Sequence, residues 1–206
     1  MPRKHLIRTD SHPYHITLRS NNQEWFDLTM NTVWDICLNA FSKAYHKHPV
    51  DLQAFILMSN HYHMLVWTPK FNLDLFMFEF NRNIGNGIRL KTNRINRIFG
   101  DRYKLSLVDN PQYYSIVIKY IYQNPIRAGL VTNCENYCYS TLFYMINSLP
   151  FVIPLINPIS KCDNEILKWI NDRYSEEENS SLKMAISKRK FIPPRSKSSR
   201  RKLLLI

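Results

Sequence analysis

Two histidines separated by a single residue occur in the middle of a strand-like run, AFILMSNHYHMLVW. Successive side chains of a strand point to opposite faces, so His61 and His63 emerge on the same face, roughly 6.5 to 7 Å apart along the strand. Two imidazoles placed in this way can serve as ligands of a divalent metal ion. The same spacing also fits two polar residues on an open sheet surface, and residues farther along the chain decide between the two interpretations.

A second group of reactive side chains occurs in the sequence KYIYQNPIRAGLV. Tyr120 and Asn124 are four residues apart, so on one helix they share a face and point to the same place. The Asn124 carbonyl oxygen suits Mg²⁺ or Mn²⁺, and the two imidazoles shift the preference toward Mn²⁺ or another transition metal. A tyrosine phenol, with a pKa of about 10, is a poor nucleophile unless a nearby group stabilises the phenolate or the reacting phosphate. A bound divalent ion polarises a scissile phosphate, and attack by the phenol yields a phosphotyrosine from which the strand can be rejoined without ATP.

Several neighbouring side chains are alternatives for these roles. Tyr113, Tyr114 and Tyr122 are alternative nucleophiles, of which Tyr113 lies about two turns before Tyr120 on a similar helix face and Tyr122 should face elsewhere. Gln123 is the alternative to Asn124 as a ligand. His15 projects from an expected strand and either reaches the substrate or is an ordinary sheet-surface histidine. Arg127 either binds phosphate or caps helix carbonyls.

The composition points to a soluble globular protein whose partner is a polyanion. The chain has 206 residues, 45% of them apolar, and Lys and Arg outnumber Asp and Glu by 28 to 16, which gives a net charge of +12. Such a charge favours nucleic acid as the partner. A membrane is not expected, because no run approaches about 18 apolar residues. The four cysteines lack the spacing of a disulfide scaffold and the N-terminus lacks a secretory signal, so we expect a cytoplasmic protein.

Basic residues are concentrated in the segment from residue 82 to residue 104, where Asp101 is the only acidic interruption. We interpret this segment as a phosphate-contacting surface, with a solvated face as the alternative. The predicted DNA contacts are His15, Arg19, Arg82, Arg89, Lys91, Arg94, Arg97, Arg102, Lys104 and Arg127.

Periodicity and turn residues predict the elements that position these side chains. We expect strands around residues 14–18, 52–58, 61–67 and 105–108, and helices over residues 25–44, 73–90 and 110–124. Gly85-Asn86-Gly87 is expected to weaken or bend the second helix, and Asn110-Pro111 is typical of a helix start. This order predicts an α+β fold of ferredoxin-like character, an antiparallel sheet with helices on one face and the opposite face free for a ligand.

Three segments together resemble a known family. HYHMLV after LMSN, then YIYQNPIRAGLV, and the early YHITLRSNN are similar to the single-tyrosine transposases of the His-hydrophobic-His (HUH) superfamily, in particular the REP-associated tyrosine transposases. The resemblance spans residues 2–141 and includes NYCYST, which resembles a Tyr-x-x-Ser-Ser element of the family. The chain departs from the family pattern at Tyr62 (usually aliphatic), Ser59 (usually proline), Ser20 (commonly glycine) and Tyr139 (often tryptophan). None of these departures removes a ligand.

The resemblance implies a metal-dependent single-strand DNA endonuclease and strand transferase with an HUH endonuclease-type core. His61, His63 and Asn124 would then bind Mg²⁺ or Mn²⁺, and Tyr120 would form a 5′-phosphotyrosine intermediate. The substrates implied are imperfect palindromes that fold into hairpins in single-stranded DNA. The wider superfamily often dimerises and exchanges the tyrosine helix, whereas this branch favours a monomer, with a homodimer as the alternative. Rival hypotheses are a domesticated hairpin-binding protein without cleavage activity and a phosphodiesterase that uses water.

The chain divides into three expected regions. Residues 1–149 would form the HUH transposase or nuclease domain. Residues 150–182 would form a linker and helical extension, in which the linker is marked by prolines. Helices are expected over residues 164–174 and 181–187. Residues 183–206 form a basic tail that we expect to be flexible and to add sequence-independent affinity for phosphates, with a merely solubilising tail as the alternative.

Overall fold

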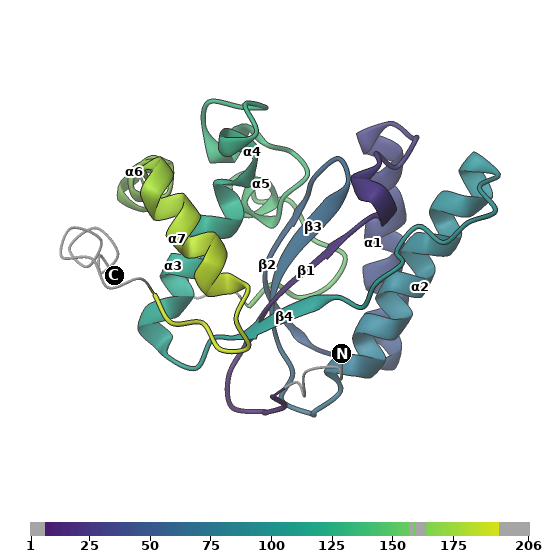
Figure 1. The fold of residues 1–206 in the computed structure, drawn as a ribbon, viewed down its shortest axis with the longest axis horizontal. Coiled ribbons are helices and arrows are strands. Elements are labelled where there is room, and N and C mark those ends of the chain that lie inside the picture. The colour runs from purple at the N-terminus through teal and green to yellow at the C-terminus, as the bar shows by residue number, and fades with distance from the viewer. Residues whose placement is uncertain (1–6, 157–158, 160–163, 194–206) are drawn as a thin grey trace.

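The structure is a computed structural model that describes residues 7–156, 159 and 164–193. Its centre is an antiparallel sheet in the order β2-β3-β1-β4 (Figure 1). The strands are β1 (Tyr14–Arg19), β2 (Asp51–Leu57), β3 (His61–Trp67) and β4 (Lys104–Leu107). Helix α1 (Met30–Lys47) connects β1 to β2, and α2 (Leu73–Thr92) connects β3 to β4. This βαββαβ order with β1 and β3 in the middle is the ferredoxin-like arrangement, so the predicted α+β class is confirmed.

Helices α1 and α2 pack side by side on one face of the sheet (Figure 1). The apolar stripe of α1 recurs at helical spacing through Val33, Cys37, Ala40 and Phe41, all buried against the sheet. The helix begins at Met30, five residues after the predicted start. The Thr29 side chain accepts a hydrogen bond from the Thr32 amide and caps the helix there, and the backbone before it turns through a positive φ at Asp27.

Helix α2 runs without interruption through Gly85 and Gly87, where the sequence suggested a weakened or bent helix. Glycine occurs at residue 87 because α2 lies very close to α1 at this position. A Cβ atom at residue 87 would lie 2.6 Å from Cγ2 of Ile36, so glycine lets the two helices approach closely.

A third helix covers part of the opposite sheet face, so the expectation that all helices lie on one face is wrong. Helix α3 (Pro111–Tyr122) begins as predicted, with the Asn110 side chain accepting a hydrogen bond from the Gln112 amide and proline in the first turn. Its residues pack with Ala54, Ile56 and Leu65, which point away from α1 and α2. The strands themselves contain the reason, because β2 and β3 carry the apolar runs AFIL and MLVW, whose side chains point to both faces, so both faces require cover.

Most of the remaining elements pack around α3: α4 (Asn124–Arg127), α5 (Thr141–Ile146), α6 (Asn164–Asn171), α7 (Glu176–Ile186) and a 3₁₀ turn at Cys134–Asn136. A second 3₁₀ turn, at Asn21–Gln23, follows β1 and bonds to the backbone at Arg97 and Ile98. Trp169, Leu182 and Phe191 belong to the same apolar cluster as α3. No helix in the described part of the chain is long and apolar enough to cross a membrane.

The segment after α7 returns to the sheet. The Leu107 amide donates to the Arg189 carbonyl, and the Phe191 amide donates to the Leu107 carbonyl, so this segment lies beside β4. The predicted boundary at residue 183 falls inside α7. The part of the predicted tail that the structure describes is folded, because Phe191 is fully buried. Residues 194–206 lie outside the described residues.

Candidate active site

The two histidines of the HYH triplet lie on β3 and face α3. Their ring centroids are 5.2 Å apart, and the register pairs His63 with Thr17 and His61 with Arg19. His63 is buried and His61 is partly exposed. Tyr62, between them, points to the other face and is fully buried under α2. The spacing therefore places both imidazoles together, as the sequence predicted.

One nitrogen of each imidazole is held by a neighbouring side chain. His61 Nδ1 lies 2.7 Å from Asn60 Oδ1, and because an amide oxygen only accepts, Nδ1 carries the hydrogen. His63 Nδ1 lies 3.0 Å from Nε2 of His15, which is 1% exposed. When His63 Nδ1 donates to His15, the Nε2 atoms of both His61 and His63 keep free lone pairs. Metal-binding histidines are oriented by partners of this kind.

Burial keeps these three imidazoles neutral at physiological pH. Burial, with a contribution from Arg127, lowers the pKa of His15 to about 3. Burial and the charges of Arg19 and Arg127 lower the pKa of His61 to about 4. The pKa of His63 lies well below its ordinary value, first because of burial and then because of the neighbouring histidines and arginines. A neutral imidazole has the lone pair that a metal ligand needs.

Tyr120 approaches the histidines from α3. Its ring centroid lies 5.8 Å from that of His63 and 6.2 Å from that of His15, edge-on in both cases. The Arg127 guanidinium carbon lies over the Tyr120 ring, 4.1 Å from its centre. The tyrosine is therefore held between the histidines of the sheet and a cation from α4.

Asn124 and Arg127 are joined in one hydrogen-bond network. The Asn124 amide nitrogen donates to the carbonyls of Tyr120 and Ile121, and its Oδ1 accepts from Arg127 Nη2 at 2.7 Å. Arg127 Nη1 also donates to Oδ1 of Asn179 on α7, at 3.1 Å. Arg127 thus binds both the Asn124 side chain and, at 3.4 Å, the backbone carbonyl of Tyr120.

The residues present fit a divalent metal ion. In the described residues no three His, Cys, Asp or Glu side chains converge as a ready ligand set. The donors that would hold such an ion are the Nε2 atoms of His61 and His63 and, as the sequence predicts, Asn124 Oδ1, which accepts from Arg127 and keeps a second lone pair. This mixed nitrogen and oxygen set suits Mn²⁺ or Mg²⁺ with open positions left for a substrate.

The alternative residues lie elsewhere. The Tyr113 ring packs edge-on against Phe191, with centroids 5.7 Å apart. The Tyr122 hydroxyl bonds to the Thr141 hydroxyl. The Gln123 amide donates to the carbonyls of Ile170 and Asp172. These contacts direct the three side chains toward other parts of the fold, whereas the Tyr120 ring contacts His63 and His15.

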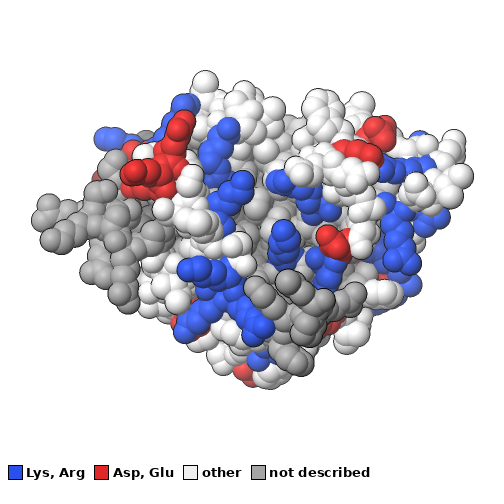
Figure 2. All heavy atoms as spheres, viewed as in Figure 1, with Lys and Arg blue, Asp and Glu red and all other residues white. Residues whose placement is uncertain are grey.

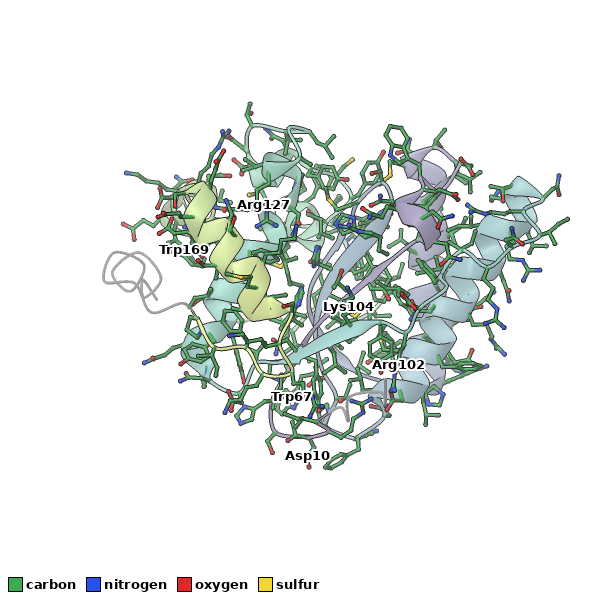
Figure 3. The ribbon with its side chains drawn as sticks, in the orientation of Figure 1. Asp10, Trp67, Arg102, Lys104, Arg127 and Trp169 are labelled. Atoms are coloured by element: carbon green, nitrogen blue, oxygen red, sulfur yellow. The ribbon has the colours of Figure 1, made fainter. Side chains whose placement is uncertain are left out.

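The predicted DNA-contacting residues separate into groups. Arg19 and Lys104 are exposed on the histidine face of the sheet, since Lys104 pairs with Thr17 in the register. Figure 2 shows Lys and Arg side chains gathered over the middle of the molecule, and Figure 3 shows Lys104 on β4 and Arg127 beside α7. Arg82, Arg89, Arg97 and Arg102 line a different cavity beside α2. Lys91 lies in the last turn of α2, and Arg94 forms ion pairs with Glu24 and Asp27.

Three supporting residues were not identified as such from the sequence. His15 was expected to reach the substrate or lie on the sheet surface, yet it is buried and bonded to His63. Asn60 orients His61, and its position next to the histidine in a hairpin turn was the available signal. Asn179 carries no local signal, because its contact with Arg127 joins residues 52 positions apart.

The chain shares its fold and its family with transposases. It is similar to a solved structure entitled "Structure of the REP associates tyrosine transposase bound to a REP hairpin", with a TM-score of 0.58 and 20% identity, covering 74% of this chain and 88% of that one. No curated protein sequence matches the chain. Residues 8–124 match the family described as "Transposase IS200 like", a range that contains all four strands, the three histidines, Tyr120 and Asn124. The chain therefore belongs to the family of IS200-like transposases.

Proposed function

We propose that this protein is a metal-dependent single-strand DNA transposase that cleaves and rejoins DNA at hairpin sequences through a covalent 5′-phosphotyrosine at Tyr120. The observation that carries the proposal is the contact of the Tyr120 ring with the His63 ring, 5.8 Å apart between centroids, in a member of this family. The similar solved protein is bound to a REP hairpin by its title, which supports a hairpin as the DNA form.

His61, His63 and Asn124 would hold Mg²⁺ or Mn²⁺ through their free Nε2 atoms and Oδ1. The bound ion would polarise the scissile phosphate and neutralise its charge. His15 and Asn60 keep the two imidazoles in the tautomer that leaves Nε2 available. The low histidine pKa values favour this neutral state across the physiological range.

Tyr120 is the nucleophile in this proposal. Its Oη forms a bond to phosphorus while the bond to the 3′ oxygen of the preceding nucleotide breaks. The downstream fragment becomes linked to the protein through its 5′ phosphate, and the upstream fragment leaves with a 3′-OH. The phenol loses a proton and the departing 3′ oxygen gains one, which balances the step. Arg127, 4.1 Å from the ring centre, is placed to neutralise negative charge as the attack proceeds. Attack by a 3′-OH on the phosphotyrosine reverses the step and rejoins DNA.

Arg19 and Lys104 supply the first phosphate contacts on this face. Both are exposed, both lie on the same side of the sheet as the histidines, and Arg19 is close enough to His61 to lower its pKa. A strand lying across β1 and β4 would meet these cations before it reaches Tyr120.

The test is incubation with a pool of end-labelled hairpin oligonucleotides and Mn²⁺, followed by a denaturing gel for a protein-linked DNA band. Tyr120→Phe should abolish the band and leave DNA binding within about two-fold, because the substitution removes one oxygen and keeps the ring. Tyr113→Phe is the matched control and should keep the band. His61→Ala should lose it through loss of the metal.

Each contrary outcome has a distinct meaning. A covalent band in Tyr120→Phe would contradict the assignment of the nucleophile. Tight binding without a band in the wild type would instead identify a hairpin-binding protein without cleavage activity. Cleavage without a band would identify a phosphodiesterase that uses water. A monomer is proposed as the active form, and a mass measurement in solution tests it.

A further inference from the structure

Three polar side chains lie along one line of the tyrosine helix. They are Lys119, Gln123 and Arg127, spaced four residues apart, and the amides of Gln123 and Arg127 donate to the carbonyls of Lys119 and Gln123. The helical backbone therefore continues from α3 into α4, and the three side chains share a face. All three contact α6, α7 or the loop between them, which together we call the α6–α7 unit (residues 164–186; Figure 1).

Lys119 is a buried cation among aromatic rings. It is 1% exposed, and its Nζ lies 5.1 Å from the ring centre of Trp169 and 4.7 Å from that of Tyr174. Nζ also lies 3.8 Å from Oδ2 of Asp172. Burial of an ammonium group is costly unless such partners surround it, so the α6–α7 unit is what makes a lysine tolerable at this position.

Gln123 and Arg127 bind polar groups of the same unit. Gln123 is also 1% exposed, and its Nε2 donates to the carbonyls of Ile170 and Asp172, at 2.7 and 2.9 Å, at the C-terminal end of α6. Arg127 Nη1 donates to Oδ1 of Asn179 on α7 at 3.1 Å. Contacts at three successive turns fix both the position of the tyrosine helix along its axis and its rotation about that axis.

The α6–α7 unit is itself attached to the central sheet. Ser175 and Glu178 form a capping box at the start of α7, which holds the loop between the two helices. After α7 the chain reaches β4, where the Leu107 amide donates to the Arg189 carbonyl. Strand β4 pairs with β1, and β1 pairs with β3. The unit therefore connects the tyrosine helix to the sheet that carries the histidines.

Each of the three contacts occurs next to a residue of the candidate site. Lys119 precedes Tyr120, Gln123 precedes Asn124, and Arg127 contacts both the Tyr120 ring and Asn124 Oδ1. Adjacent residues of a helix point about 100° apart, so the face held by the unit and the face turned to the histidines rotate together. A rotation that breaks the contacts with the unit would carry the Tyr120 ring away from the histidines.

We propose that the α6–α7 unit is part of the active site, in that it holds Lys119, Gln123 and Arg127 and through them positions Tyr120 against the histidines. This role rests on the proposed function, because Tyr120 is the nucleophile there. Lys119, Gln123 and Arg127 are thus positioning residues as far as these contacts are concerned. The unit follows the range 8–124 that matches the family, so this support for the tyrosine comes from outside the matched residues.

The test uses Asn179, which is partly exposed, so that its replacement leaves the core intact. Asn179→Leu keeps the size of the side chain but removes the acceptor for Arg127, whereas Asn179→Asp keeps an acceptor oxygen. The matched control is Asn171→Leu. Asn171 lies in the same unit and is also partly exposed, but it bonds to Glu135 and to the Cys134 amide instead of the tyrosine helix.

The first measurement is the position of the Tyr120 ring in the DNA-free protein. This ring lies 5.8 Å from the His63 ring and 6.2 Å from the His15 ring, so the NMR signals of the two imidazoles in histidine-labelled protein respond to its displacement. Asn179→Leu should shift both signals. Asn179→Asp and Asn171→Leu should leave both signals as they are in wild type.

The second measurement is the rate of covalent adduct formation at saturating hairpin DNA and Mn²⁺. Asn179→Leu should lower this rate by about 10- to 100-fold, since a displacement of about 1 Å can have an effect of that size. Asn179→Asp should restore the rate, and Asn171→Leu should keep it even when its melting temperature falls as far as that of Asn179→Leu.

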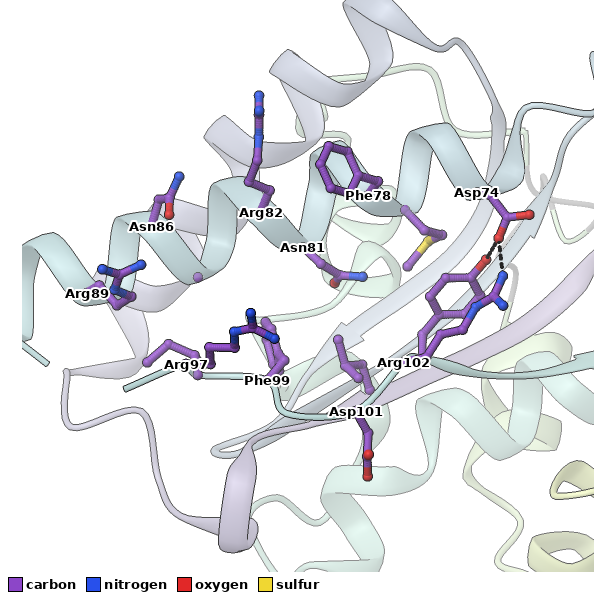
Figure 4. Close-up of a pocket in the computed structure, with 15 residues that line it drawn as sticks. Asp74, Phe78, Asn81, Arg82, Asn86, Arg89, Arg97, Phe99, Asp101 and Arg102 are labelled. Atoms are coloured by element: carbon purple, nitrogen blue, oxygen red, sulfur yellow. Dashed lines mark hydrogen bonds and ion pairs between the residues drawn. The ribbon is translucent and has the colours of Figure 1, made fainter. Parts of the chain in front are cut away.

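Hairpin affinity should not change in any of these variants. The predicted DNA-contacting residues Arg82, Arg89, Arg97 and Arg102 lie in the cavity beside α2 that Figure 4 shows, and no lining residue described for that cavity belongs to the α6–α7 unit. An effect on the rate at saturating DNA, with unchanged affinity, therefore separates positioning of Tyr120 from DNA binding.

A second pair of variants tests the other end of the unit. Lys119→Ala empties the space between Trp169 and Tyr174, so it should lower the adduct rate and shift the imidazole signals as Asn179→Leu does. Lys119→Met fills that space again with a flexible side chain that packs well against aromatic rings, and it should restore both the rate and the signals.

The outcomes separate this role from the proposed function. Unshifted imidazole signals and a wild-type rate in both Asn179→Leu and Lys119→Ala would overturn the positioning role. An equal loss of rate in Asn171→Leu and Asn179→Leu would also overturn it, because the unit would then contribute only general stability. If wild type forms no adduct and the signals shift in Asn179→Leu but not in Asn171→Leu, the unit holds Tyr120 as proposed and the transposase chemistry is contradicted.

Discussion

His63 has one nitrogen available for a ligand because His15 occupies the other. The 3.0 Å bond between His63 Nδ1 and His15 Nε2 is buried, so water does not compete for it. Partners of this kind raise the basicity of a metal-binding histidine and fix its ring, and their removal typically costs 10–100-fold in metal affinity. In the proposed mechanism His15 is a positioning residue, and its 1% exposure leaves it no surface for the DNA contact that the sequence suggested.

We therefore predict that His15→Ala weakens Mn²⁺ binding by about 10- to 100-fold while the direct ligand variant His63→Ala abolishes it. Calorimetric titration of the DNA-free protein with Mn²⁺ measures this without relying on cleavage. His46→Ala, an exposed histidine on α1, is the control and should bind Mn²⁺ as wild type does. Wild-type affinity in a folded His15→Ala protein would show that the bond to His63 does not position the ligand.

Asp74 provides a pH dependence that is separate from the histidines. Burial opposes its ionisation, but hydrogen bonds from Arg8, Tyr103 and Arg102 outweigh that effect and lower the pKa of Asp74 from 3.8 to about 2. A carboxyl whose pKa is lower in the folded than in the unfolded protein stabilises the fold at pH values above the unfolded pKa. For Asp74 this stabilisation is lost as the pH falls from about 4 through 2. The side chain is half exposed, so solvent screening limits the contribution to about 1 kcal/mol.

The prediction is that Asp74→Asn lowers the melting temperature at neutral pH by a few degrees and that the difference from wild type shrinks as the pH falls toward 2. Circular dichroism melts over a pH series measure it. Asp101→Asn removes an exposed carboxylate from the same region and should change the melting temperature by less at every pH. A constant deficit in Asp74→Asn from pH 7 to pH 2 would contradict the ion-pair explanation.

At the scale of elements, the two glycines of α2 have opposite roles although they are two residues apart. Gly87 faces α1, where a Cβ would lie 2.6 Å from Ile36 Cγ2, and the β-branched Ile36 side chain has little freedom to move away. Gly85 faces open space. Sequence patterns treat both as helix-weakening residues, and only the packing of α1 against α2 separates them.

Gly87→Ala should therefore destabilise the protein by about 1–3 kcal/mol through overpacking, whereas Gly85→Ala should stabilise it by up to about 1 kcal/mol through helix propensity. Urea denaturation of both variants gives the two values. Combining Gly87→Ala with Ile36→Ala should relieve the overlap, so the added methyl should cost less in that background. Equal effects at the two glycines would contradict the close approach of α1 and α2.

The elements that sequence could predict are those set by local patterns. The histidine pair, the start of α3 at Asn110-Pro111 and the four strands depend on alternation, caps and turns within a few residues. The predicted start of α1 at Trp25 was wrong because helical spacing extends back to that residue, but Thr29 provides the cap. The bonds from His15 to His63 and from Tyr62 to Asn81 join residues 48 and 19 positions apart, so no local pattern contains them.

At the scale of the whole molecule, the sheet separates two apolar clusters with different functions. One holds α1 and α2 over the face of Tyr62, and the other holds α3, α6 and α7 over the β2 and β3 half of the histidine face. The near-continuous apolar runs of β2 and β3 contained the signal that both faces are covered. Because α3 covers only that half, exposed Arg19 and Lys104 remain beside the buried histidines. We propose that a substrate approaches Tyr120, which is 5% exposed, from the β1 and β4 side.

The second cluster also determines how the site is completed. Tyr120 contacts His63 within one chain, and Arg127 fixes the end of the tyrosine helix to α7 of the same chain through Asn179. We propose that a chain built in this way needs no helix from a second copy. We predict that an equimolar mixture of Tyr120→Phe and His63→Ala proteins forms no more covalent DNA adduct than either variant alone, since each chain lacks one part of its own site.

Gel analysis of the mixture after prolonged co-incubation measures the amount of adduct. A mixture of wild type with His63→Ala gives the signal expected when one chain in two has an intact site. Recovery of the adduct in the first mixture would mean that the tyrosine helix is exchanged between chains, in which case the active form is a dimer and the contact of Tyr120 with His63 in one chain is not the catalytic one.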